Sequence, residues 1–161
     1  MGLAADLALL FHRDLPRLLQ QIEAFPDDEI LWRTCPGVTN PAGNLVLHLE
    51  GNLREYIGRQ LGGAAYNRKR DLEFSSKGPP KQDLTRRIAE LRELIPGIVA
   101  TLSSEQMQSA YPEVVLEAPL STQAFLIHLH GHLNWHMGQI DYLRRTLSGH
   151  GAIRAAGLPA D

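Results

Sequence analysis

The chain has 161 residues, of which 43% are hydrophobic and 21% charged, and its formal net charge is −2. This balance is ordinary for a globular protein and gives no reason to expect a nucleic-acid partner or an anionic membrane surface. No apolar run approaches the ~20 residues of a membrane span, and the N-terminus makes a poor signal peptide. Cys35 is the only cysteine, which excludes an intramolecular disulfide and fits a reducing cytoplasm.

Residues 7–25 carry the first helical pattern, in which apolar side chains recur at spacings of three and four. Pro16 falls inside this pattern and is expected to kink or split the helix, because proline cannot donate the usual backbone hydrogen bond. Residues 29–39, which contain a tryptophan, a proline and a glycine, are expected to form a packed connector.

A second helix is predicted for residues 40–61. Asn40 is expected to cap it, with the following proline at the first helical position. A polar connection, residues 64–80, comes next, and connections that long are usually functional or disordered. We interpret its basic run, Arg68-Lys69-Arg70, as a solvated loop; the sequence does not assign a role to the connector.

Two further helices are predicted in the second half of the chain, for residues 81–102 and 121–147. Ser121 is a plausible cap for the last helix, which stops at a glycine. Residues 103–120 form a second connector, and its short Val-Val-Leu run is too isolated to build a sheet.

Four long amphipathic helices joined by two long connectors predict an all-α four-helix bundle. We expect one domain over residues 1–161, with a flexible tail at 149–161. Bundles of this kind place metal or cofactor sites on inward-facing positions of neighbouring helices.

Two histidines of the fourth helix, His132 and His136, share its apolar stripe. The spacing of four puts both imidazoles on one face, with Cβ atoms roughly 5–6 Å apart. Two ring nitrogens can then reach one metal ion at about 2.0–2.1 Å each, and His48 on the second helix could supply a third. The spacing alone leaves the alternative open, in which these are interior histidines bonded to backbone carbonyls or carboxylates.

Other polar side chains lie close to these histidines in the predicted helices. His128, one turn before His132, could be a fourth ligand, a general base or part of a cavity wall, and it is our candidate catalytic residue. Asn52 and Gln139 could present amides to a bound cofactor or bond to helix neighbours. The remaining candidates are interpreted as structural, packing or surface groups: His12, His130, Trp135, Met137, Asp141 and His150.

Two motifs carry a resemblance to a known family. They are Asn44-Leu-Val-Leu-His48-Leu-Glu-Gly-Asn52-Leu and His132-Leu-Asn-Trp-His136-Met-Gly-Gln139-Ile, and Arg70-Asp-Leu-Glu-Phe74 lies between them. In this order they resemble the DinB-like (YfiT-like) superfamily of metal-dependent bundles. The resemblance implies an up-down-down-up bundle, a divalent metal held by His48, His132 and His136, and a homodimer.

The same resemblance implies a class of chemistry, because the superfamily includes transferases and isomerases that act with mycothiol, bacillithiol or glutathione. We therefore expect a metal-dependent transferase that uses a low-molecular-weight thiol and a small-molecule substrate. Zn or Ni is the expected metal, with Fe, Cu or Mn as alternatives. Two other functions stay open: a metal-dependent hydrolase with His128 or Glu50 as general base, and a non-catalytic metal-binding or stress-related dimer.

Overall fold

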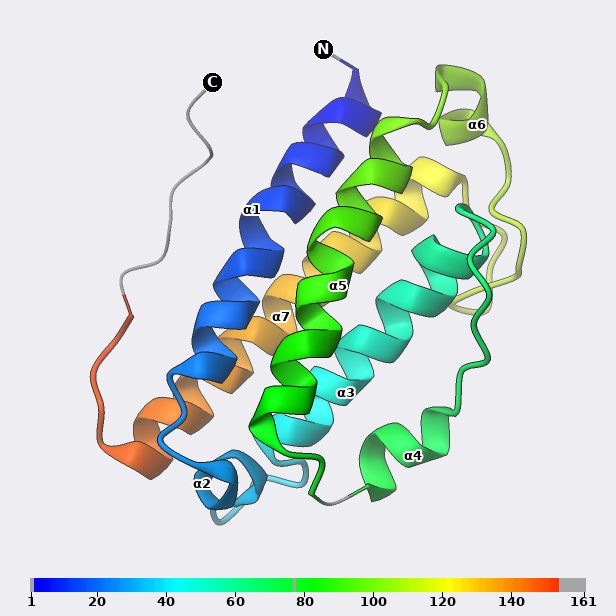
Figure 1. Ribbon diagram of the computed structural model, residues 1–161. Helices are drawn as coiled ribbons and strands as arrows, with labels where there is room; N and C mark the ends of the chain where they lie inside the picture. The colour runs from blue at the N-terminus through cyan, green and yellow to red at the C-terminus, as the bar shows by residue number, and fades with distance from the viewer. Residues whose placement is uncertain (1, 77, 154–161) are drawn as a thin grey trace.

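The computed structural model describes residues 2–76 and 78–153, and within them the secondary structure is helical apart from two isolated bridges. Four long helices lie side by side as a bundle (Figure 1). They are α1 (Leu3–Glu23), α3 (Ala42–Leu53), α5 (Lys81–Ala100) and α7 (Thr122–Ser148). Helices α1 and α7 run in one direction and α3 and α5 in the other, as Figure 1 shows. The predicted all-α, up-down-down-up four-helix bundle is therefore confirmed.

Three short helices interrupt the segments that we expected to be irregular. They are α2 (Asp28–Trp32), α4 (Arg70–Ser75) and α6 (Ser104–Gln108). Each has only five or six residues, too few for a hydrophobic period to stand out in the sequence. Helix α3 continues into a π-helical segment, η1 (Arg54–Arg59), which the sequence did not predict either.

The predicted helix ends were partly right. The Ser121 side chain accepts a hydrogen bond from the Ala124 N–H, and Gly149 ends α7 with a left-handed φ of +73°. The Asn40 cap was wrong, because α3 begins after Pro41 and no side chain caps it. Pro16 does not split α1; Leu15 and other fully buried residues hold the helix in the core.

The long helices meet around one apolar core. Helix α1 packs against α5 and α7, while α3 packs against α5, α7 and the short helix α4. The interface between α3 and α7 brings together the two helices that carry the candidate ligands. No helix in the described part of the chain is long and apolar enough to cross a lipid bilayer. Residues 154–161 of the predicted tail lie outside the described residues.

Candidate metal centre

Three histidines converge between α3 and α7. The Nε2 atom of His132 lies 3.1 Å from the Nε2 of His48 and 3.1 Å from the Nε2 of His136. One ring nitrogen from each of the three histidines lies within 4.8 Å of those of the other two. The i, i+4 spacing on α7 and the packing of α3 against α7 together produce this cluster.

The outer nitrogens of two of these rings are already occupied. Nδ1 of His48 lies 2.8 Å from a carboxylate oxygen of Glu73, and Nδ1 of His136 lies 2.7 Å from the amide oxygen of Gln139. Since both oxygens can only accept, each Nδ1 carries the hydrogen in the neutral ring. The Nε2 lone pairs of His48 and His136 are thus directed into the cluster.

Burial favours the neutral form of the two rings on α7. It lowers the pKa of His132 to about 3, and the neighbouring imidazoles, first of all His136, act in the same direction. Burial also lowers the pKa of His136, although its hydrogen bond to Gln139 opposes the shift. Neutral imidazole is the form that binds a metal.

The residues present fit a metal ion. Nitrogens bound at about 2.05 Å to a tetrahedral metal lie about 3.3 Å apart, close to the spacing found between these rings. Without an ion, Nε2 of His132 lies 3.1 Å from two other ring nitrogens. It carries at most one hydrogen and can therefore donate to only one of them. Three imidazoles would also leave a coordination position open, as catalytic sites do.

Helix α4 orients one of the three rings. Its Glu73, whose side chain is buried, receives two hydrogen bonds from Arg68, at 2.6 and 2.8 Å, besides the one from His48. Burial raises the pKa of Glu73, but the hydrogen bonds from Arg68 and His48 outweigh it and lower the pKa overall. Our interpretation of Arg68 as part of a solvated loop was wrong, because only Lys69 and Arg70 of that run are exposed.

A glycine makes room for this arrangement. A Cβ built on Gly51 would lie 2.2 Å from Oε1 of Glu73, so the absence of a side chain at this position leaves room for the Glu73 carboxylate against α3. The sequence analysis missed Glu73 as a site residue. The motif that ends at Phe74 was the available signal, but the partner of Glu73 is 25 residues away.

A cavity of about 490 Å³ opens beside the cluster, and His48 and His132 form part of its wall. His128 also lines it, stacked 5.9 Å from the ring of Phe125 and 6.1 Å from that of His132. Asn52 lines the same cavity, and its Oδ1 is buried without a hydrogen-bond partner in the described structure.

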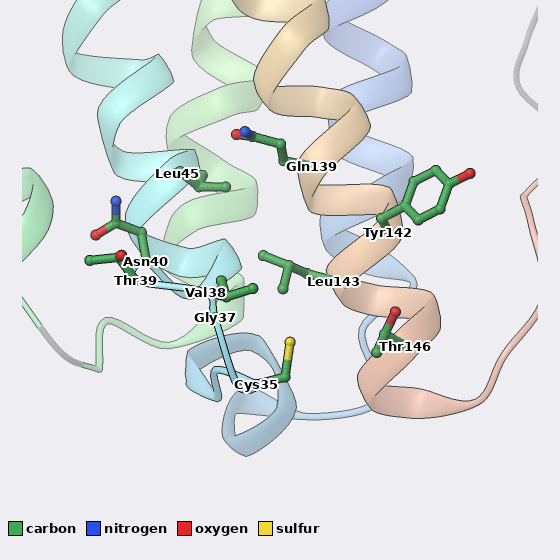
Figure 2. Close-up of a pocket in the computed structure, with 10 residues that line it drawn as sticks. All are labelled: Cys35, Gly37, Val38, Thr39, Asn40, Leu45, Gln139, Tyr142, Leu143 and Thr146. Atoms are coloured by element: carbon green, nitrogen blue, oxygen red, sulfur yellow. The ribbon is translucent and has the colours of Figure 1, made fainter.

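A second cavity, of about 450 Å³, lies beside the C-terminal part of α7 (Figure 2). Gln139 and Leu143 of α7 border it, and Figure 2 shows Cys35 at the far end of the space from Gln139. Gln139 links this cavity to the histidine cluster, because its amide oxygen bonds to His136.

The other histidines lie elsewhere. His130 faces α1, where its Nε2 is 2.9 Å from the buried carboxylate of Asp14, as expected of a structural group. His12 and His150 are exposed, and Met137 is partly buried against the core, as interpreted.

Three expectations about neighbouring residues can also be checked. Trp135 is 68% exposed, so our interpretation of it as a packing residue within the chain was wrong. Asp141 pairs with Arg144 at 2.9 Å and is not part of the cluster. Glu50, the alternative general base, is buried and already bonded to the guanidinium of Arg54.

The fold is the one expected of a DinB-like helical bundle, and comparison with known proteins bears this out. A crystal structure of a DinB-like protein from Bacillus cereus ATCC 10987 superposes with a TM-score of 0.64 over 92% of this chain and 91% of that one, at 14% identity. At this identity the similarity shows the fold alone. No curated protein sequence matches the chain. Residues 6–149 match the mycothiol-S-transferase family, and the chain belongs to that family.

Proposed function

We propose that the protein is a metal-dependent S-transferase that joins a low-molecular-weight thiol of the mycothiol type to an electrophilic small molecule. The observation that carries this proposal is the convergence of three imidazole nitrogens in a chain of the mycothiol-S-transferase family. In it, His48, His132 and His136 hold a divalent ion, with Zn or Ni the favoured choices. Such an ion lowers the pKa of a thiol, so that the thiolate is available near neutral pH.

The protein's own groups prepare the site for this chemistry. Glu73 and Gln139 fix the rings of His48 and His136 with the Nε2 lone pairs directed inward. His128 is exposed, lines the adjoining cavity and makes only ring contacts among the described residues. It is therefore free to take the proton that the thiol loses.

Two other functions draw less support from the structure. In a hydrolase, His128 or Glu50 would serve as general base, and the carboxylate of Glu50 is already bonded to Arg54, which leaves His128 alone for that role. A non-catalytic metal-binding protein needs no cavity beside the metal, whereas His48 and His132 border one of about 490 Å³. Both alternatives predict no thiol conjugate in the assay below.

We also propose that residues 1–161 form one domain and that the protein is a homodimer, as the superfamily resemblance implies. Large apolar side chains lie exposed on the outer face of α7, Ile127 at 52%, Trp135 at 68% and Tyr142 at 69%. A second copy that covered this face would remove them from water. Sedimentation velocity measures the oligomeric state directly.

The proposal is tested by following conjugation of monochlorobimane to mycothiol, with bacillithiol and glutathione as comparisons. In this reaction the thiol sulfur bonds to the bimane methylene carbon, chloride leaves with the bonding electrons, and the thiol proton is released. We expect zinc-loaded protein to accelerate conjugation with one of the thiols, and chelated protein or His132→Ala to lose the acceleration. No acceleration by zinc-loaded or nickel-loaded protein with any of the three thiols would contradict the proposal.

A further inference from the structure

Helix α4 has no buried apolar side chain. Of its six residues only Glu73 is buried, while Leu72 is 51% exposed. A helix this short is not stable by itself, so its position depends on bonds to the rest of the molecule. Since the carboxylate of Glu73 orients the ring of His48, the bonds that hold α4 also decide where that carboxylate lies.

Asn44 of α3 holds the C-terminal end of α4. It is 1% exposed, and its amide nitrogen Nδ2 donates to the carbonyl oxygens of Glu73 and Ser76, at 2.8 and 2.9 Å. The last carbonyls of a helix have no partner within the helix, so Asn44 supplies donors where α4 lacks them. Both amide hydrogens of a buried side chain are thus used to hold one short element in place.

Glu73 is held at its backbone and at its side chain by the same face of α3. Asn44, His48 and Gly51 follow one another on α3 at spacings of four and three, so they share the face that packs against α4. Asn44 binds the backbone oxygen of Glu73, and Nδ1 of His48 lies 2.8 Å from its carboxylate oxygen. Gly51 leaves free the space that this carboxylate occupies.

From these contacts we propose that Asn44 is a positioning residue of the metal centre. It fixes α4, so that the carboxylate of Glu73 meets His48 and the ring presents its Nε2 to the cluster. The effect on a bound metal rests on the proposed function, whereas the effect of Asn44 on the contact between His48 and Glu73 does not. A purely structural bond would stabilise α4 without changing either that contact or the affinity for zinc.

The contact between His48 and Glu73 can be followed by NMR in the metal-free, full-length protein. The hydrogen on Nδ1 of His48 bonds to a carboxylate, so its resonance is shifted downfield and protected from exchange with water. The resonance is identified by its absence in His48→Ala. In Asn44→Ala we expect it to move upfield or to be lost through exchange, with the helical circular dichroism unchanged.

An unchanged resonance in Asn44→Ala would overturn the proposal, because it would show that Glu73 reaches His48 without the help of Asn44. If Asn44→Ala does not fold, Asn44→Ser is measured in its place, and the same two outcomes decide.

Zinc affinity, measured by competition with a chromophoric chelator, tests the consequence for the ion. We expect Asn44→Ala to weaken zinc binding about tenfold, because it loosens the group that orients a ligand. The matched control is Ser103→Ala, which removes a side-chain bond to the backbone of another short helix, α6, and should leave the affinity unchanged. Equal affinities of the wild type and Asn44→Ala would reduce Asn44 to a structural role.

A double-mutant cycle shows whether Asn44 acts through Glu73. Once Glu73→Ala has removed the carboxylate, adding Asn44→Ala should change zinc affinity by less than about twofold. The same addition should still lower the urea midpoint, because two buried carbonyls lose their donors. Additive losses of zinc affinity would contradict the proposed route.

The two proposals can fail separately. If the His48 resonance responds to Asn44→Ala but the wild type binds no zinc, the positioning of His48 stands and the metal-dependent function fails. If the wild type binds zinc and forms the thiol conjugate, but neither the resonance nor the affinity responds to Asn44→Ala, the role of Asn44 fails instead.

Discussion

Helix α7 contacts its neighbours through histidines on two faces, and the two faces differ in how their polar atoms are satisfied. Against α1, His130 and Asn134 both lie within 3.0 Å of the buried carboxylate of Asp14, and Arg13 contacts the same group at 2.6 Å. Against α3, His132 meets two other imidazoles and no carboxylate. Its Nδ1 is buried without a partner among the described residues.

We propose that this difference separates a structural histidine from a metal-binding one. At the α1 face, charged and neutral groups donate hydrogen bonds to one carboxylate, and this carboxylate needs no further partner. Burial raises the pKa of Asp14, but the hydrogen bonds, first that from His130, outweigh it and hold the pKa well below its usual value. At the α3 face, imidazole rings converge on one another, which is an arrangement that a cation would complete.

The largest expected effect on stability comes from the α1 face. Asp14→Ala leaves His130 and Arg13 without their shared carboxylate, and we expect the free energy of unfolding to fall by about 3 kcal/mol. Urea denaturation of the metal-free protein measures this loss. Zinc binding should be retained, since the α3 face is untouched, and the exposed control Asp6→Ala should change stability by less than about 0.5 kcal/mol.

The second effect is a dependence on pH in metal-free protein. The folded pKa of His132, about 3, lies below its unfolded value of about 6.5, so the unfolded chain binds the extra proton between these values. Stability should therefore fall as the pH drops from about 6.5 toward 3. The groups that face this ring are His48, His128, His136 and Arg68.

The urea midpoint, measured from pH 7 to pH 4, checks the sign of this dependence. His132→Leu should flatten the fall, because leucine takes up no proton. The contribution of Asp14 to stability has the same sign in a lower pH range, because its depressed pKa preserves its stabilisation until the pH falls below about 3.9. A midpoint that stays constant or rises on acidification would show that His132 is not held neutral by the fold.

A smaller effect is expected from the carboxylate that orients His48. Glu73→Gln keeps an acceptor oxygen but loses the charge, and we expect zinc affinity to fall about 10-fold to 100-fold with the fold intact. Competition with a chromophoric chelator gives the affinity, and circular dichroism reports the fold. Glu29→Gln, on the exposed surface of α2, is the matched control; equal affinities for both variants would remove Glu73 from the site.

The smallest effects come from two helical glycines. Gly51→Ala brings a methyl group into Oε1 of Glu73, so zinc affinity should fall by no more than in Glu73→Gln. Gly97→Ala meets no atom within 4 Å and should instead raise stability by about 0.5–1 kcal/mol without changing zinc affinity. If both substitutions leave zinc affinity unchanged, the close approach of α4 to α3 is unimportant for the metal site.

The sequence predicted what depends on regular periodicity. The long helices and the pairing of His132 with His136 follow from spacings of three and four, which fix a helix face before tertiary structure is known. The contact of Glu73 with His48 could not be predicted from periodicity, because α4 has only six residues. The Glu73 carboxylate also occupies space that Gly51 leaves free, which spacing in the sequence does not show. The exposure of Trp135 likewise depends on which helices α7 meets.

The two amides that the sequence left undecided illustrate the same limit. Gln139 is one turn from His136 and bonds to it, a local contact that spacing allowed but did not require. Asn52 is one turn from His48 and yet its Oδ1 bonds to nothing in the described structure. The two amides differ in their tertiary surroundings, which the sequence spacing does not predict.

The most direct test of the metal centre is the zinc content of protein dialysed against zinc, determined by elemental analysis for four histidine variants. We predict about one zinc ion per chain for the wild type and for His130→Ala, and loss of that ion in His48→Ala, His132→Ala and His136→Ala. Equal zinc content in all of these proteins would contradict the account, because it would show that the three converging imidazoles do not form the site.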